Sequence, residues 1–228
     1  MPDLIFIPAL IIVDLQEDFC PPHGSLAVAE GRDIATPVNE LLSFSSFAVR
    51  VATQDWHPQD HISFASNHTG KKPFTDFTTV INPHNPEEKY DTRLWPVHCV
   101  QHTKGAELIP ELDFAKIDEL VKKGTDPRVE MYSAFYDPFK SPRVSDSGLV
   151  RMLKDKGVTH VYVVGLAYDY CVKSTAIDAA SEGFTTYVIE EATKAVAGAE
   201  WTECTKALEK EGVKVVRMDG DEVKRLRQ

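Results

Sequence analysis

The sequence has too few cysteines, spaced too widely, to build a disulfide scaffold or a zinc knuckle. Its 228 residues contain four cysteines and no CxxC pair: Cys20, Cys99, Cys171 and Cys204. Small disulfide-rich domains and zinc knuckles both depend on closely spaced cysteines. We therefore exclude both classes and expect free thiols in a reducing compartment, the cytoplasm or alternatively the nucleus.

Positive charge and long apolar runs are also scarce. Lys and Arg number 25 against 35 Asp and Glu, which gives a formal net charge of −10, and no basic cluster offsets it. Proteins that bind nucleic acid or an anionic membrane surface carry basic patches. The longest apolar run, residues 4–13, is shorter than the ~20 residues that cross a bilayer. We expect neither nucleic acid nor a membrane as a partner, and a homo-oligomer stays open.

No repeat or low-complexity tract divides the chain, so we expect one domain over residues 1–228. Strands that are apolar on both faces and alternate with amphipathic helices are typical of a parallel, doubly wound α/β sheet flanked by helices. The strands are predicted at residues 4–13, 48–53, 117–121, 160–165, 186–189 and 213–217. The helices are predicted at residues 34–42, 148–156, 172–182 and 200–211.

Residues 57–103 break this alternation of strands and helices. The segment is rich in proline, asparagine, histidine and aromatic residues. Irregular segments longer than about 12–15 residues in a compact domain are usually functional or disordered. Histidines gather near its start, and Trp95, His98 and Cys99 lie near its end. We therefore expect an irregular region that forms a metal site or a lid.

Reactive side chains follow four of the predicted strands. In open parallel sheets, ligands bind in the crevice outside the carboxyl ends of the strands. In chain order these ends carry a carboxylate, a metal-ligand pair, an amine and a thiol: Asp14, Asp55 with His57, Lys122–Lys123, and Cys171. The sequence therefore brings four kinds of reactive group to one edge of the sheet.

Taken alone, three of these residues have ordinary structural explanations. Asp14 fits a turn cap, Lys123 fits a solvated surface, and Cys171 fits a small buried apolar side chain. Together at one sheet edge they indicate a nucleophilic site. A nearby ammonium and a helix N-terminus both lower the pKa of a thiol from its usual value of about 8.5. Asp14 could then take the thiol proton and pass it to a leaving group.

Asp55 and His57 form a second cluster, which indicates a bound metal ion. Residues two apart on an extended chain project to the same side, so one carboxylate and one imidazole can bind the same ion. We choose His98 as the third ligand, with His61 and His102 as rivals. One carboxylate and two imidazoles suit a divalent ion, zinc first, with iron(II) and manganese as alternatives. No nucleotide cofactor is expected.

Several short segments occur together in a fixed order: IIVDLQEDF, TQDWHPQDHISF, LWPVHC, KG, YSAF and GLAYDYCV. This set resembles the nicotinamidases of the isochorismatase-like cysteine hydrolases, and the resemblance extends from residue 10 to residue 180. It implies the family's six-stranded parallel sheet in a Rossmann-like, three-layer arrangement. It also implies hydrolysis of nicotinamide to nicotinate and ammonia through a cysteine thioester, a step of NAD salvage, and activity on pyrazinamide.

The resemblance also assigns roles to individual residues. Lys123 matches the family's lysine better than Lys122 because it directly precedes Gly124. The implied acid/base, lysine and nucleophile are Asp14, Lys123 and Cys171. The implied metal ligands are Asp55, His57 and His98. The implied oxyanion hole consists of the backbone N–H groups of Ala167 and Cys171, beside a cis peptide bond between Leu166 and Ala167.

The same resemblance implies a pocket for a small aromatic ring. Its walls would be Phe19, Trp95, Tyr132, Leu166, Ala167 and Tyr170. Tyr132 and Tyr170 also fit ordinary core aromatics, since aromatic side chains are readily buried. The chain departs from the family at Glu17, where relatives often have Asn, and this departure leaves the substrate preference slightly open.

Three other functions compete with this interpretation. A related cysteine hydrolase could act on another small amide, although such relatives lack the metal ligands. Two histidines and one carboxylate could form an iron(II) oxygenase site, which has no need of Asp14, Lys123 and Cys171. A binding module without catalysis is the third rival, and it would be expected to lack one of the reactive residues, all of which are present.

Overall fold

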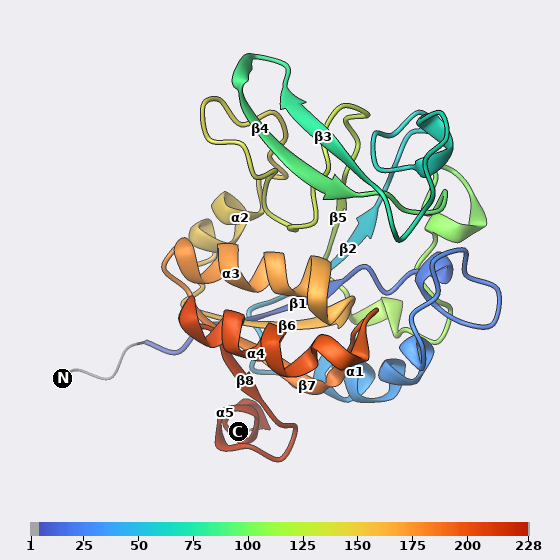
Figure 1. Ribbon diagram of the computed structural model, residues 1–228. Helices are drawn as coiled ribbons and strands as arrows, with labels where there is room; N and C mark the ends of the chain where they lie inside the picture. Colours follow the sequence, from blue (N-terminus) through green and yellow to red (C-terminus); the bar gives the residue numbers. More distant parts are fainter. Residues whose placement is uncertain (1–4, 228) are drawn as a thin grey trace.

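A six-stranded sheet lies at the centre of the molecule, and the computed structural model describes residues 5–227 (Figure 1). Its strands are β1 (Pro8–Val13), β2 (Val49–Asp55), β5 (Glu119–Lys123), β6 (His160–Leu166), β7 (Thr185–Lys194) and β8 (Lys214–Val216). Neighbouring strands are all parallel, in the order β5-β2-β1-β6-β7-β8. The predicted six-stranded parallel sheet is confirmed, although Leu4 of the predicted first strand lies outside the described residues.

Helices cover both faces of this sheet, because its central strands present apolar side chains on both sides. In β1, Leu10 and Ile12 pack into one core, while Ile11 and Val13 pack into the other. The first core includes α1 (Ala35–Leu42) and α5 (Asp221–Lys224). The second includes α2 (Leu149–Asp155), α3 (Lys173–Ser181) and α4 (Trp201–Lys210), and Figure 1 shows α3 and α4 side by side. Within residues 5–227, no helix is long and apolar enough to cross a bilayer.

The chain leaves β6 through a backbone that only glycine allows. Gly165 has φ +108°, and a Cβ atom built there would lie 2.0 Å from the carbonyl oxygen of Val13 in the neighbouring strand β1. The next peptide bond, Leu166–Ala167, is cis, as the family resemblance implies. A π-helical turn (Tyr168–Val172) then leads into α3. Cys171 thus lies inside this turn, whereas the sequence pattern predicts a helix that begins at residue 172.

The segment predicted as irregular contains a β-hairpin, which corrects that expectation. β3 (Phe77–Asn82) and β4 (Asn85–Arg93) pair antiparallel at the top of the view in Figure 1. The alternation that usually marks a strand is hidden here, because β3 exposes Phe77 and Ile81 to solvent and buries Val80. Val80 packs with Val129 and Phe139, and Tyr90 of β4 lies against the same cluster.

Strand β5 lies two residues further along the chain than its pattern predicts. The prediction covers residues 117–121, but the strand runs from Glu119 to Lys123 at the edge of the sheet. As an edge strand it pairs only with β2 and exposes Leu120. The polar residues at the partly or fully exposed positions of β5 therefore interrupt the run of apolar residues that would mark the strand in the sequence. As a result, Lys123 is the last residue of β5 and is almost fully buried.

Candidate active site

The reactive side chains come from the carboxyl ends of four strands that are adjacent in the sheet. Across β5, β2, β1 and β6, the strand ends deliver Lys123, Asp55, Asp14 and, after the π-helical turn, Cys171. The register pairs Asp55 with Lys123 and Val13 with Gly165. Parallel strands thus bring together residues that are far apart in the sequence, as expected at the carboxyl edge of an open sheet.

Lys123 lies at the centre of this group. Its Nζ atom is 2.5 Å from Asp55 Oδ1, 3.0 Å from Asp14 Oδ2 and 3.5 Å from Cys171 Sγ. Burial disfavours the ammonium, but Asp14 and Asp55 outweigh it and raise the pKa of Lys123 well above its usual value. Lys123 is therefore a fixed positive charge beside the thiol, and the prediction of Lys123 over Lys122 agrees with its position.

Asp14 is held by its neighbour in β2. Its backbone has φ 48°, its N–H donates to Thr53 Oγ1 (3.1 Å), and the Thr53 hydroxyl donates to Asp14 Oδ1 (2.6 Å). Oδ2 is buried and faces the ammonium of Lys123. Burial raises the pKa of Asp14 to about 6, against the opposing effect of Lys123. Such a carboxyl group can exchange a proton near neutral pH.

The pKa of Cys171 is raised in this environment, which corrects the expectation of a lowered pKa. Burial raises its pKa well above the usual value, and the nearby carboxylates of Asp14 and Asp55 add to this effect, while Lys123 opposes it. Its Sγ atom, one Asp14 oxygen and one Asp55 oxygen all lie within 4.8 Å of one another. The thiol therefore has a carboxylate at hand that can accept its proton.

The three predicted metal ligands converge on one point. One ligand atom each from Asp55, His57 and His98 lies within 4.8 Å of the other two. His57 Nδ1 contacts Gly124 O (2.9 Å) and His98 Nδ1 contacts Pro96 O (2.8 Å), so both Nε2 atoms are left to face the site. His57 Nε2 is buried and has no hydrogen-bond partner within residues 5–227. A buried orphan nitrogen beside a carboxylate fits a bound cation.

The protonation of Asp55 and His98 also suits a metal ion. Burial and the neighbouring His57 lower the pKa of His98 to about 4, so its ring is neutral, as a ligand must be. Although burial disfavours the charged ring of His57, Asp55 raises its pKa, so an ion bound there would have to displace a proton from His57. Although burial disfavours the charge of Asp55, Lys123 and His57 hold the pKa of that carboxyl group below its usual range. Asp55 is therefore ionised, and the donor set of one carboxylate and two imidazoles fits a divalent ion.

The two rival histidines are occupied elsewhere. His61 Nδ1 pairs with Ser63 Oγ (2.8 Å) and Nε2 with Val129 O (3.1 Å), so both ring nitrogens already have partners, although one ligand atom of His61 lies within 4.8 Å of one each from His57 and Glu130. The His61 ring instead packs against His57, with 4.0 Å between ring centroids. His102 packs against Trp56 and belongs to none of the metal-compatible clusters found among the described residues. This placement favours His98 as the third ligand.

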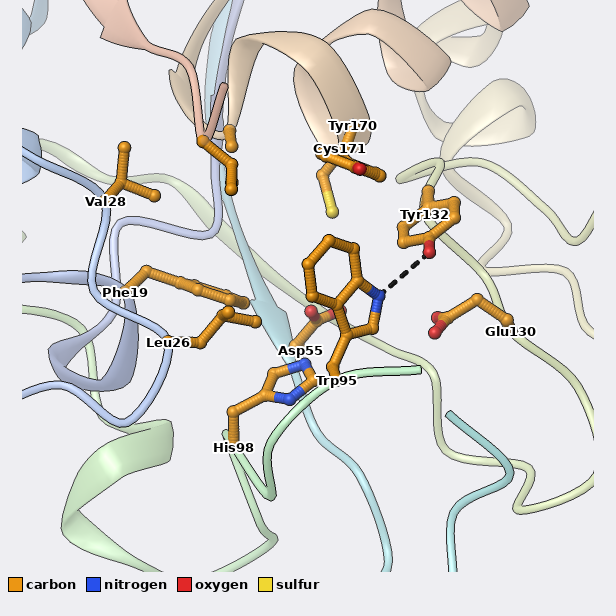
Figure 2. Close-up of a pocket in the computed structure, with 12 residues that line it drawn as sticks. Phe19, Leu26, Val28, Asp55, Trp95, His98, Glu130, Tyr132, Tyr170 and Cys171 are labelled. Carbon is orange, nitrogen blue, oxygen red and sulfur yellow. Dashed lines mark hydrogen bonds between the residues drawn. The ribbon is translucent and has the colours of Figure 1, made fainter. Parts of the chain in front are cut away.

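A small cavity opens beside the thiol and the metal ligands (Figure 2). Five of the six predicted pocket residues line it: Phe19, Trp95, Tyr132, Ala167 and Tyr170. The sixth, Leu166, is fully buried, does not line the cavity and packs near Gly31. In the view of Figure 2, Phe19, Leu26 and Val28 lie on one side of Trp95, and Tyr132 and Glu130 on the other. The aromatic walls suit a small flat ring.

The sequence pattern missed several residues that shape this site. Gln16 holds Asp55 by two hydrogen bonds, from its Nε2 to Asp55 O and from Asp55 N–H to its Oε1, both 2.8 Å. Thr53 orients Asp14, and Glu130 is a buried carboxyl group in the cavity wall. Polar residues at the ends of apolar strands could have pointed to Gln16 and Thr53. The signal for Glu130 is a charged residue that stands between two apolar residues in the sequence, Val129 and Met131.

Comparison with known proteins agrees with this geometry. The family model described as the isochorismatase domain matches residues 8–220. The chain belongs to the isochorismatase family. A nicotinamidase of Acinetobacter baylyi is 45% identical over 82% of this chain and 81% of its own. The yeast nicotinamidase bound to the inhibitor nicotinaldehyde has a TM-score of 0.87 and 34% identity over 92% of this chain and 100% of its own.

A third relative in this family contains a metal ion. The pyrazinamidase of Pyrococcus horikoshii in complex with zinc has a TM-score of 0.70 and 33% identity, over 92% of this chain and 98% of its own. The resemblance of the sequence motifs to nicotinamidases is therefore confirmed. In this chain, Asp55, His57 and His98 form one of the groups of described residues that could hold a metal ion.

Proposed function

We propose that this chain hydrolyses nicotinamide to nicotinate and ammonia through a thioester on Cys171. The observation that carries the proposal is the contact of Lys123 Nζ with both Asp14 (3.0 Å) and Cys171 (3.5 Å), beside residues that can hold a cation. Relatives named nicotinamidase at 37–45% identity support the choice of substrate. Neither the oxygenase nor the binding-module alternative needs this arrangement.

The first half of the reaction forms the thioester. Asp14 accepts the proton of the Cys171 thiol while the sulfur attacks the carboxamide carbon, and Lys123 stabilises the negative charge that develops on sulfur. The carbonyl oxygen becomes an oxyanion, for which the backbone N–H groups of Ala167 and Cys171 are the proposed donors. Asp14 then gives its proton to the amide nitrogen, the C–N bond breaks, and ammonia leaves.

The second half restores the thiol. A water molecule gives a proton to Asp14 and attacks the thioester carbon, after which the C–S bond breaks and nicotinate is released. The departing sulfur takes the proton back from Asp14. Because the pKa of Asp14 is about 6, one carboxyl group can serve both as base and as acid near neutral pH.

Asp55, His57 and His98 are the residues that would hold a divalent ion, for which zinc is our first choice. Bound there, the ion would act as a Lewis acid toward the lone pair of the pyridine nitrogen and so help to orient the ring. Phe19 and Trp95 enclose the same cavity and would restrict the plane of the ring. Pyrazinamide has the same carboxamide and, like nicotinamide, a ring nitrogen meta to it, and we propose it as a second substrate.

The test is an ammonia-release assay on nicotinamide and pyrazinamide, with Cys171→Ala as the inactive variant. We expect Cys171→Ala to lower kcat by about 10³-fold or more, since removing the nucleophile leaves only binding effects. Cys204→Ala is the matched control, because Cys204 is a buried thiol on α4, away from the cavity. Full activity of Cys171→Ala would overturn the mechanism. Turnover of another amide but not nicotinamide would overturn only the substrate.

We also propose the cytoplasm as the compartment, with the pathway of NAD salvage as the setting. The support is chemical: all four cysteines are free and buried. Thiols persist in reducing compartments, whereas secreted proteins of this kind tend to pair them. Labelling of the protein in cells with a thiol reagent, before and after denaturation, would measure the redox state directly.

A further inference from the structure

A second cavity lies behind the active-site pocket. Its volume is about 330 Å³, and its walls come from residues 90–92 of β4, from the segment 130–138 and from one face of α3. Glu130 and Tyr132 line both this rear chamber and the active-site pocket. The two spaces are thus separated by little more than two side chains.

Tyr132 forms the main part of this partition. Its hydroxyl accepts a hydrogen bond from Trp95 Nε1 (3.0 Å), drawn as the dashed line in Figure 2, and pairs with Thr92 Oγ1 (3.1 Å). Trp95 lines the active-site pocket and Thr92 lines the rear chamber. The hydroxyl therefore lies at the boundary between them. A rotation of the Tyr132 ring would break these two hydrogen bonds and open a passage between the pocket and the rear chamber.

The rear chamber is acidic. Asp91, Glu130 and Asp178 line it, whereas no lysine or arginine is part of its wall among the described residues. The guanidinium of Arg143 lies over the ring of Tyr136 (3.5 Å to the centroid), but Arg143 does not line the chamber. Such a chamber attracts a small cation and repels a carboxylate.

The two products of the proposed reaction differ in charge, so this chamber would admit ammonia and repel nicotinate. In the proposed reaction, ammonia forms while the nicotinoyl group is still attached to Cys171. That group would occupy the active-site pocket, whose walls include Leu26, Val28 and the exposed Val196. Nicotinate is an anion that forms only later. A rear route lets ammonia leave before the acyl group does, and its removal suppresses the reverse attack on the thioester.

We propose that the rear chamber is the exit route of ammonia, with Tyr132 and Glu130 as its gate. The proposal rests on the function proposed above. Ammonia passes the gate as the neutral molecule and takes a proton from water in the chamber. The ammonium ion then passes the acidic side chains of the chamber and reaches solvent.

Hydroxylamine is the probe for this route, because it is close to ammonia in size and captures thioesters. Attack on the acyl-enzyme gives nicotinohydroxamate, whereas water gives nicotinate, so the ratio of the two products measures access to the thioester. Ser174 lies on the chamber-facing side of α3. We expect Ser174→Phe, which fills the chamber, to lower the hydroxamate-to-nicotinate ratio about tenfold.

Three further variants make the result decisive. Ile177→Phe fills the same chamber one turn along α3 and replaces Ser174→Phe if that variant does not fold. Ser45→Phe is the matched control, since Ser45 is exposed and lines neither cavity, and its ratio should equal that of the wild type. Val196→Phe narrows the front of the pocket and should lower kcat/KM for nicotinamide without changing the ratio.

An unchanged ratio in active Ser174→Phe and Ile177→Phe would overturn the rear route. A ratio that falls only in Val196→Phe would assign the exit to the front of the pocket and overturn it equally. If the wild-type protein forms neither product from nicotinamide, the proposed function has failed instead. The two failures are therefore distinguishable in one set of assays.

Discussion

Burial decides the direction of the pKa shift at Cys171 and Asp14, whereas neighbouring charges decide it at Lys123 and Asp55. Lys123 lowers the pKa of Cys171, as the sequence suggests, but burial and the carboxylates of Asp14 and Asp55 outweigh it. A motif shows which groups meet, whereas the balance of desolvation and Coulomb effects depends on depth in the protein. The sequence therefore predicted which groups lie together at this site, but not the direction of the pKa shift at Cys171.

The raised pKa of Asp14 leads to a prediction for the pH dependence. Asp14 must be ionised to accept the thiol proton, and its pKa is raised to about 6, so it stays protonated between pH 4 and 6. We expect kcat/KM for nicotinamide to fall on the acid side with a midpoint near pH 6. The measurement is a pH–rate profile with the metal site kept saturated.

Thr53→Val provides the matched variant for this profile. The Thr53 hydroxyl donates to Asp14 Oδ1 and lowers the pKa of that carboxyl group. Its loss should therefore move the acid midpoint to higher pH. A wild-type midpoint near pH 4, or one that does not respond to Thr53→Val, would show that a group other than Asp14 is the base.

At the scale of elements, the carboxyl ends of the strands were predictable and the edges of the structure were not. Central strands such as β1 and β6 are buried on both faces, so their apolar runs mark them clearly. The edge strand β5 and the hairpin β3–β4 each expose part of their apolar surface. Their patterns depend on tertiary packing, which is why the sequence misplaced β5 by two residues and missed the hairpin.

The close approach of β6 to β1 predicts a large effect of one methyl group. Gly165→Ala would place Cβ 2.0 Å from Val13 O in a backbone with φ +108°. We expect the variant to lose about 3 kcal/mol or more of its free energy of unfolding, measured by urea denaturation. The clash involves backbone on both sides, so side-chain rotation cannot relieve it.

Gly183→Ala is the control for this measurement. Gly183 has φ +93°, but a Cβ atom added there would meet no other atom within 4 Å, so this variant reports the backbone strain without the clash. We expect a loss of about 1–2 kcal/mol there, the usual cost of a left-handed backbone for a residue with a Cβ atom. Equal losses in the two variants would contradict the importance of the contact between β6 and β1.

At the scale of the whole molecule, the site is a concentration of buried charge. Asp14, Asp55 and Glu130 are all nearly fully buried, and Lys123 is the one buried ammonium among the described residues. Burial of carboxylates without enough counter-charge opposes folding. A divalent ion at Asp55, His57 and His98 would supply the missing positive charge. The protein as a whole should therefore be more stable with the metal than without it.

Removal of the metal should accordingly lower both activity and thermal stability. We expect a chelator to abolish hydrolysis of nicotinamide and to lower Tm, and added Zn²⁺ to restore both. An ion at 100 times its dissociation constant stabilises the folded state by about 2.7 kcal/mol. His57→Ala should remove the response of Tm to Zn²⁺, while His102→Ala should keep it, since His102 packs only on Trp56. Loss of the response in both variants would contradict the assigned ligand set.

The position of Lys123 on an edge strand has a consequence for local opening. β5 is held in the sheet by β2 alone, whereas β1, β2 and β6 each have two neighbours. Segments with few partners open at a lower free energy than the core. Detachment of β5 would carry the ammonium away from Asp14 and Cys171 while the rest of the sheet stayed folded. Catalysis would then cease before global unfolding, and enzymatic activity would be a more sensitive reporter of the sheet edge than any spectroscopic signal of the core.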